Sequence, residues 1–204
     1  MLYWLNQRAK QPDSAANCEH AILTPRALAA IALMAALTAV GAWLRIPLPY
    51  VPVTLQMSFV YLSGIWLGAR GGFLAQAVYV GAGLVGFPLF AKGGGPQYVL
   101  EPSFGYIAGF LPAAFCAGIM AQRTTTYGGY LLAAAAALCM VYVPGVIWLY
   151  IALNHVLGQS TTPVAALALG LSTLPKDLAL LPLNAYLGQQ VRRRLPYIAS
   201  EHVT

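Results

Sequence analysis

Long apolar runs make up most of this chain, and the stretches between them are rich in Pro, Gly and basic residues. A transmembrane helix needs about 20 predominantly apolar residues, because it must cross a hydrocarbon layer about 30 Å thick. Six stretches come near this length, at residues 27–44, 53–68, 72–91, 103–121, 130–153 and 163–190. The pattern therefore predicts an all-α membrane protein, a bundle of six transmembrane helices whose second span is short and either tilted or partly interfacial.

The composition agrees with this pattern, since 59% of the 204 residues are hydrophobic and only 8% are charged. Soluble domains carry about 25% charged residues. The net charge of +6 would suit a nucleic-acid partner if the basic residues formed a patch, but they stand mostly at the ends of apolar runs. We therefore expect membrane lipid around the chain and no nucleic acid.

The basic residues also predict the orientation, because cytoplasmic loops of membrane proteins carry an excess of Lys and Arg. With the N-terminus inside, the outer side holds Arg45 and Lys92, and the inner side holds Arg8, Lys10, Arg26, Arg70, Arg123, Arg192, Arg193 and Arg194. Lys176 lies within a span and counts for neither side. We predict a multi-pass protein of the cell membrane with both termini in the cytoplasm.

The chain divides into a cytoplasmic leader at residues 1–26, a membrane domain at residues 27–191 and a basic cytoplasmic tail at residues 192–204. The leader lacks the uninterrupted apolar core and the small-residue cleavage site of a secretory signal peptide. Cys18, Cys116 and Cys139 are odd in number and widely spaced. This spacing does not predict a disulfide framework or a zinc site.

Two connections on the predicted outer side are unusual, and we call them the proline segment (residues 45–56) and the glycine segment (residues 86–102). The proline segment has three prolines within six residues, which excludes regular helix and favours extended backbone. The glycine segment contains three consecutive glycines. Irregular backbone at membrane depth is tolerated where protein buries it or where it lines a cavity. The two segments are therefore either walls of an outer pocket or flexible surface loops.

Lys176 and Asp177 are the only Lys, Arg, Asp or Glu residues between positions 124 and 191. A charge near the bilayer centre costs at least about 2.5–3.5 kcal/mol, so it marks a candidate functional site. Neighbouring residues of a helix do not face each other, which argues against a simple ion pair between these two. Pro175 predicts a helix break just before them. If the helix restarts there, Asp177 lies in its first turn, where free N–H groups favour an anion.

Further polar residues extend this candidate site. Asn184 stands seven residues after Asp177 and therefore on the same helix face. Lys92, Gln97, Tyr98 and Glu101 surround the glycine run and, with Lys176, give an outer pocket cations, an anion and an amide. The alternative is that Asp177 only caps the broken helix, which would still leave an acceptor oxygen for a ligand.

The first span carries small residues at helical spacing, Ala32, Ala35, Ala36 and Ala39. Such spacing lets helix backbones approach closely in lipid. The alanine face can pack within the protein's own bundle or dock a separate membrane subunit, and spacing alone favours the first.

Motifs for catalysis and nucleotide binding are missing from the chain. The pattern G-x-x-x-x-G-K-[ST], whose backbone cradles phosphates, does not occur, and neither does H-E-x-x-H. His155 has no second His, Cys or carboxylate at helical ligand spacing, which disfavours a metal site. We expect no enzyme activity, no metal and no cofactor. If transport uses ATP, another subunit hydrolyses it.

Three motifs resemble those of the BioY family, the biotin-specific substrate-capture (S) components of energy-coupling factor (ECF) transporters. They are P-V-T-L-Q at residues 52–56, L-G-x-R-x-G at residues 67–72 and G-x-P-x-F-A-x-G-G-G at residues 86–95. The resemblance covers about residues 27–190, nearly the whole membrane domain. It implies a six-helix bundle with an outward-facing biotin site near the two outer segments and the last helix.

The resemblance also implies partners. The alanine-rich first helix would meet the transmembrane coupling subunit, which reverses the preference from spacing alone, and two ATPase subunits would complete the transporter. Biotin would be the transported ligand and not a cofactor. A homo-oligomer is a further form that the sequence leaves open.

The chain departs from the family at some site positions. The last span reads P-K-D-L-A-L where members often have P-G-D-L-x-K, so Asp177 matches, Lys176 replaces a usual Gly and Leu180 stands in place of the Lys. Glu101 and Phe104 replace usual glycines, whereas Tyr106 matches. The resemblance therefore carries a ligand role over to Asp177 and does not carry one to Lys176.

The chemistry of biotin suggests a role for each candidate. Asp177 would accept from the ureido N–H groups, Gln97 or Tyr98 would donate to the ureido oxygen, and Lys176 or Lys92 would meet the carboxylate. Phe87, Phe90 and Phe104 would form an apolar wall of the kind that small-molecule sites have. The predicted binding residues are Asp177, Lys176, Gln97, Tyr98, Glu101, Tyr106, Lys92 and Phe90.

The sequence thus predicts a biotin transporter that captures its ligand at the outer face and delivers it inward with ECF subunits. Two alternatives are an S component for another vitamin and a self-sufficient, oligomeric biotin facilitator. A membrane-embedded enzyme is the weakest alternative, because no catalytic arrangement is found.

Overall fold

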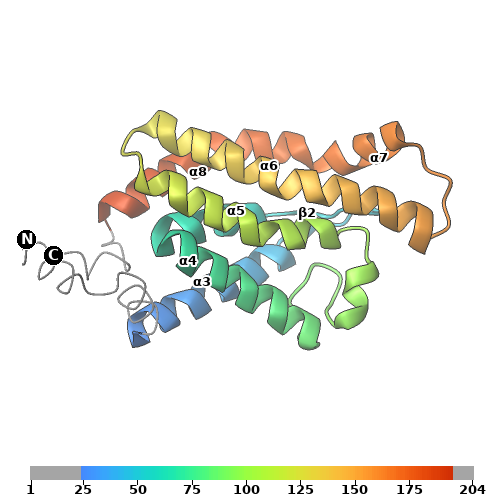
Figure 1. Cartoon of the computed structure of the whole chain (residues 1–204), viewed down its shortest axis with the longest axis horizontal. Helices are drawn as coiled ribbons and strands as arrows, with labels where there is room; N and C mark the ends of the chain where they lie inside the picture. The colour runs from blue at the N-terminus through green and yellow to red at the C-terminus, as the bar shows by residue number, and fades with distance from the viewer. Residues whose placement is uncertain (1–23, 195–204) are drawn as a thin grey trace, which may run out of the picture.

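The computed structural model describes residues 24–194. Most of the predicted leader, including Cys18, and most of the predicted basic tail lie outside these residues. The described helices and strands are α3 (Pro25–Trp43), β1 (Arg45–Ile46), β2 (Val53–Thr54), α4 (Gln56–Val85), η1 (Pro96–Leu100), α5 (Phe104–Gln122), α6 (Tyr127–Ile151), the π-helical η2 (Ala152–Val156), α7 (Pro163–Gly170), η3 (Leu171–Thr173) and α8 (Leu174–Arg194). They form an elongated, all-α bundle, as predicted (Figure 1).

Four helical stretches of the described residues are long and apolar enough to cross a membrane: Pro25–Trp43, Phe104–Gln122, Tyr127–Val156 and Pro163–Arg194. The predicted spans at residues 53–68 and 72–91 both fall within the single element α4, so the count of six spans is not confirmed. Residues 53–54 belong to β2 instead of a helix. α4 ends at Val85, so residues 86–91 of the predicted third span belong to the glycine segment and not to a helix.

α4 nevertheless consists of two helical arms that meet at Gly68. Gly68 has φ 76° and ψ 179°, a backbone conformation that no helix contains and that favours glycine. A Cβ on Gly72 would lie 2.6 Å from Cα of Gly64. Residues eight apart in a straight helix are about 12 Å apart, so the two arms bend sharply toward each other.

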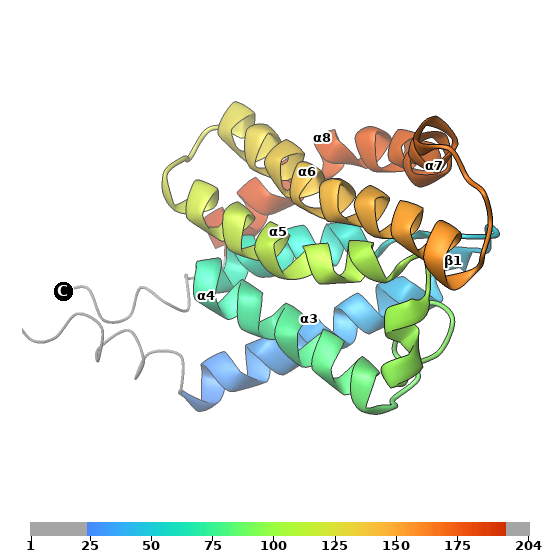
Figure 2. The ribbon, with the colours of Figure 1, turned by 45° about the vertical axis from the view of Figure 1, so that its right-hand side comes forward.

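Small residues decide how closely α4 and α5 pack. A Cβ on Gly64 would lie 2.2 Å from the carbonyl oxygen of Ala114, and a Cβ on Gly118 would lie 2.3 Å from the backbone nitrogen of Ala69. Only glycine permits these contacts, because any side chain would push the two backbones apart. Figure 2 shows the resulting layers, with α5 between α4 and α6.

The alanine face of α3 divides into two rows. Ala35 and Ala39 are buried in the core of the bundle, whereas Ala32 and Ala36 are exposed. The first row therefore packs within the bundle, and the second lies on the surface of the described chain.

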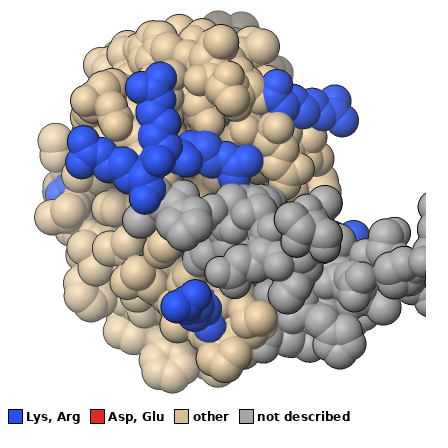
Figure 3. All heavy atoms as spheres, turned by 90° about the vertical axis from the view of Figure 1, so that its left-hand side faces the viewer, with Lys and Arg blue, Asp and Glu red and all other residues tan. Residues whose placement is uncertain are grey.

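Basic residues gather at one end of the bundle. Figure 3 faces the end where α3 begins, α5 passes into α6 and α8 finishes, and the described surface there shows Lys and Arg but no Asp or Glu. Arg26, Arg123 and Arg192–194 belong to these helix ends. The proline and glycine segments lie at the opposite end (Figure 1).

Candidate functional site

A pocket of about 50 Å³ lies at the end of the bundle that carries the proline and glycine segments. Its walls come from both segments, from α5 and α6, and from the start of α8. The polar residues that line it include Thr54, Tyr98, Tyr106, Tyr142, Lys176 and Asp177. Val51, Ile107 and Phe110 are among its apolar residues. Both outer segments are therefore walls of a pocket, as one of the two interpretations of the sequence predicted.

A 3-10 turn interrupts the helix before the charges, although Leu174 keeps helical backbone angles (φ −59°, ψ −41°). α7 ends at Gly170, the 3-10 turn η3 follows, and α8 begins at Leu174. Pro175 suits this place, because the first turn of a helix does not need its backbone donor. Asp177 therefore lies in the first turn of α8, where the helix dipole favours its negative charge.

Asp177 is only 6% exposed, and neighbouring side chains hold its carboxylate. The Tyr142 hydroxyl, from α6, donates to Asp177 Oδ2 at 2.6 Å. The same hydroxyl lies 2.8 Å from Thr173 Oγ1, which can donate to it in turn. A carboxylate has about four lone-pair sites on its two oxygens, so Asp177 keeps acceptor capacity for a ligand.

Lys176 and Asp177 do form an ion pair, which the sequence argued against, but the pair is not isolated, because Thr54 and Tyr142 also contact it. Lys176 Nζ pairs with Asp177 Oδ1 and also donates to the carbonyl oxygen of Thr54. The rule about neighbouring residues concerns the directions of their Cβ atoms, and the flexible four-carbon stem of lysine can fold back at a helix start. Lys176 thereby ties α8 to the proline segment.

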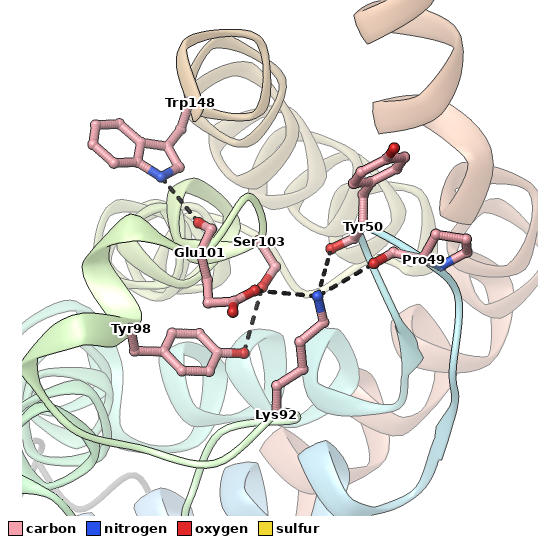
Figure 4. Close-up of polar contacts among 7 residues, drawn as sticks. All are labelled: Pro49, Tyr50, Lys92, Tyr98, Glu101, Ser103 and Trp148. Atoms are coloured by element: carbon pink, nitrogen blue, oxygen red, sulfur yellow. Dashed lines mark hydrogen bonds and ion pairs between the residues drawn. The ribbon is translucent and has the colours of Figure 1, made fainter. Parts of the chain in front are cut away.

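Lys92 joins the two outer segments. Its Nζ donates to the carbonyl oxygens of Pro49 at 3.3 Å and Tyr50 at 3.5 Å, and it pairs with Glu101 Oε2 at 3.1 Å (Figure 4). Trp148 Nε1 on α6 donates to the carbonyl oxygen of Glu101 at 3.1 Å. We call this group the outer clasp. It links the proline segment, the glycine segment and α6.

The backbone of the glycine segment requires its glycines. Gly93 has φ 122° and Gly95 has φ 107°, values that side chains rarely adopt. A Cβ on Gly94 would lie 2.0 Å from the carbonyl oxygen of Phe87. The run therefore makes a tight, folded loop that leads into η1.

This loop positions Tyr98 through Phe90. Phe90 is 1% exposed, and its ring packs directly against Gly83. A Cβ on Gly83 would lie 2.2 Å from the ring of Phe90. The rings of Phe90 and Tyr98 are 4.5 Å apart between centroids. Phe90 therefore supports Tyr98 from behind. Burial raises the pKa of the Tyr98 phenol above its ordinary value, so the hydroxyl remains a donor at neutral pH.

The structure brings four predicted site residues into the pocket, namely Asp177, Lys176, Tyr98 and Tyr106. The others lie elsewhere. Gln97 is exposed and donates to the carbonyl oxygen of Gly94 at 2.8 Å, while Lys92 and Glu101 form the outer clasp. Phe90 lies behind Tyr98, Phe87 is 61% exposed, and Phe104 packs on Trp148.

Two residues of the site were not predicted from the sequence: Tyr142, which donates to Asp177, and Thr173, which bonds to the Tyr142 hydroxyl. Tyr142 stands inside an apolar span, where a tyrosine has no spacing signal that points to another helix. Thr173 does carry a signal, because it lies in the break before Pro175. Tyr106 donates to the carbonyl oxygen of Gly170 at 2.8 Å and packs edge-on against Tyr142, so it helps to hold this break.

Asn184 is 5% exposed, and its Oδ1 has no hydrogen-bond partner within the described residues. It does not line the pocket. The predicted polar stripe on α8 therefore continues into the protein, away from the cavity.

The sequence model of the BioY family matches residues 13–197. A "Probable biotin transporter BioY" from Lysinibacillus sphaericus is 51% identical over 129 residues, which cover 62% of this chain and 66% of the relative. A "Biotin transporter BioY" from Rhodobacter capsulatus is 31% identical over 176 residues, which cover 81% of this chain and 93% of the relative.

The fold also resembles a solved structure, described as the S-component for biotin from an ECF-type ABC transporter. The TM-score is 0.75 at 22% sequence identity, and the match covers 84% of this chain and 93% of the other. At this identity the likeness concerns the fold.

Proposed function

Because the chain belongs to the BioY family, we propose that it captures biotin in the pocket around Asp177 and passes it inward with ECF subunits. The observation that carries the proposal is the buried Asp177 carboxylate, which is held by Tyr142 and lines a pocket beneath two irregular segments. The relatives are described as transporters, and the function is transport and not catalysis.

The pocket residues suit the parts of biotin. Asp177 accepts from the ureido N–H groups, and Tyr98 donates to the ureido oxygen. Lys176 leaves Thr54 and meets the carboxylate of the valerate chain. The apolar walls formed by Val51, Ile107 and Phe110 cover the sulfur-containing ring.

The remaining predicted site residues act around the pocket. Phe90 positions Tyr98, and Gln97 stabilises the glycine run through its bond to Gly94. Lys92 and Glu101 hold the entrance closed.

Capture requires the pocket to widen. Its volume of about 50 Å³ is well below the roughly 150 Å³ of a cavity that holds benzene. Biotin has two fused rings and a side chain. Lys176 and Lys92 tie the proline segment to the rest of the pocket, so moving the segment outward frees both lysines. Two further hydrogen bonds, from Tyr50 to Gln159 and from Gln56 to Tyr79, also hold the segment.

The proposal includes the membrane topology. The two arms of α4 would each enter the membrane and complete six spans, with both termini cytoplasmic, in accord with the basic end in Figure 3. Residues 1–26 and 192–204 would then flank the membrane domain on the inner side. The exposed row of Ala32 and Ala36 would meet the transmembrane coupling subunit, and two ATPase subunits would complete the transporter.

Binding of radiolabelled biotin to the purified full chain tests the proposal. We expect saturable binding that unlabelled biotin displaces. Displacement by another vitamin at lower concentration would instead support an S component for that vitamin. Absence of binding by the folded protein would contradict ligand capture. Uptake by cells that lack coupling subunits would support a self-sufficient facilitator.

A further inference from the structure

A second cavity lies on the surface of the bundle between α4 and α5 and shares no lining residue with the pocket at Asp177. It has a volume of about 460 Å³ and is lined by Arg70, Phe73, Leu74, Pro112 and Phe115. We call it the Arg70 groove. Its volume falls within the roughly 300–1,000 Å³ of small-molecule sites. Phe73, Leu74 and Phe115 are each more than one third exposed, so the groove faces the surroundings of the bundle.

The walls of the groove are apolar and fixed. The rings of Phe73 and Phe115 meet edge to face, with centroids 6.5 Å apart. Close contact between Gly118 and the backbone of Ala69 holds the two helices together just below these rings. The lining residues on α4 run from Arg70 to Leu74, about one helical turn.

Arg70 supplies the one charge of the groove. The acidic residues within residues 24–194 are Glu101 and Asp177, and both pair with lysines at the opposite end. Arg70 consequently has no acidic partner in the described part of the chain. Its guanidinium can bind two oxygens of a phosphate at once.

We propose that the Arg70 groove binds an anionic phospholipid, with the phosphate on Arg70 and one acyl chain along Phe73, Leu74 and Phe115. Basic pockets between transmembrane helices on the cytoplasmic side are suited to anionic headgroups. The acyl chain by itself does not make the groove prefer one lipid over another, since lipid tails and apolar side chains are equally apolar. The selectivity of the groove therefore comes from the charge of Arg70.

Native mass spectrometry of the purified full chain tests this proposal, with phosphatidylglycerol and phosphatidylcholine of identical acyl chains as the probes. We expect the wild-type chain to retain phosphatidylglycerol about fivefold better, the preference that one basic residue near a membrane surface provides. Arg70→Gln should abolish the preference, and Arg70→Lys should keep part of it. Arg123→Gln is the matched control, because Arg123 is also exposed at the basic end but does not line the groove.

A second variant tests the apolar wall. Leu74→Trp fills the groove and should lower the retention of phosphatidylglycerol while Arg70 remains. Equal retention by Arg70→Gln and Arg123→Gln would overturn the proposal, because the lipid would then follow overall charge. Co-purification of a membrane partner that is lost in Leu74→Trp, with lipid retention unchanged, would also overturn it. If Leu74→Trp does not fold, the comparison of Arg70→Gln with Arg123→Gln still tests whether the groove binds the lipid.

Discussion

Two buried polar clusters lie in different halves of this bundle, and they differ in charge and in access. Thr38 on α3 and Ser63 and Gln76 on the two arms of α4 form a neutral cluster that is 0% exposed. Gln76 Nε2 donates to Ser63 Oγ at 3.0 Å and to Thr38 Oγ1 at 3.3 Å. The second cluster contains Tyr142, Thr173, Lys176 and Asp177 and opens on the pocket.

Both clusters keep an acceptor that the described residues do not fully use. In the neutral cluster it is Gln76 Oε1, which is buried without a partner. In the charged cluster it is the carboxylate of Asp177, which faces a cavity. A spare acceptor in a packed interior is a cost to stability, whereas one that lines a pocket is available to a ligand. We therefore expect substitutions in the first cluster to change stability, and those in the second to change binding.

The largest expected effect is that of Asp177→Asn on biotin affinity. The amide keeps the size of the side chain but loses its charge and one acceptor oxygen. Hydrogen bonds to charged groups contribute about 1.5–3 kcal/mol, so affinity should fall about 10- to 100-fold. Equilibrium binding of radiolabelled biotin measures the change. Asn184→Ala is the control on the same helix face, and similar small effects of both variants would reduce Asp177 to a helix cap.

Tyr142→Phe should have an intermediate effect on binding. It removes the hydroxyl that donates to Asp177 at 2.6 Å and leaves the ring that packs on Tyr106. The hydroxyl acts on biotin only through Asp177, so binding should lose less than the full value of this bond, and affinity should fall about two- to tenfold. The same binding assay measures it. If the double variant with Asp177→Asn is weaker by the product of the two losses, Tyr142 acts independently of Asp177, contrary to this scheme.

Gln76→Ala, in the neutral cluster, should lower stability and leave biotin binding unchanged. It removes two hydrogen bonds and leaves a cavity between α3 and the arms of α4, so the protein should lose about 1–3 kcal/mol of stability. Thermal unfolding in detergent measures this loss. Biotin affinity of the folded variant should remain within about twofold of the wild type. An unchanged unfolding temperature with weakened binding would reverse the assignment of the two clusters.

Glu101→Gln should have the smallest effect on affinity and act mainly on rates. The side chains of Lys92 and Glu101 are 31% and 37% exposed, and exposed ion pairs contribute about 0–1 kcal/mol. Loosening the outer clasp should accelerate biotin dissociation up to about fivefold. High salt should accelerate the wild type toward the variant, because it screens the pair. Arg45→Gln, on the proline segment, is the control, and an equally fast dissociation in this variant would mean that any change of charge near the entrance has the same effect.

The break before Asp177 and the irregular outer segments could be predicted from the sequence, because their causes are local. Pro175 removes a backbone donor just after the 3-10 turn, and the prolines of residues 47–52 restrict the backbone of the proline segment. The glycine run likewise occupies backbone angles that other residues rarely adopt. These local irregularities place the outer segments and the start of α8 at one end of the bundle. Half of the predicted site residues line the pocket there.

The count of spans was harder to predict, since it depended on one residue. Hydropathy separates residues 53–68 from 72–91, but the structure continues the helix on both sides of Gly68 as two arms of one element. Hydropathy falls at residues 68–72 because they contain Arg70 and three glycines. It does not contain the angle at which the arms meet, which close contact between Gly64 and Gly72 determines.

The sequence by itself determined the membrane character of this protein and the family to which it belongs, and it singled out Asp177 as the candidate for ligand contact. Tertiary structure alone decided which groups meet that residue. Tyr142 reaches Asp177 across 35 positions, and Lys176 reaches Thr54 across 122. The physical reason is that hydropathy and backbone restriction act along the chain, whereas contacts between side chains depend on helix rotation and crossing. Those are set by the close packing of glycine and alanine across helices, which no local pattern specifies.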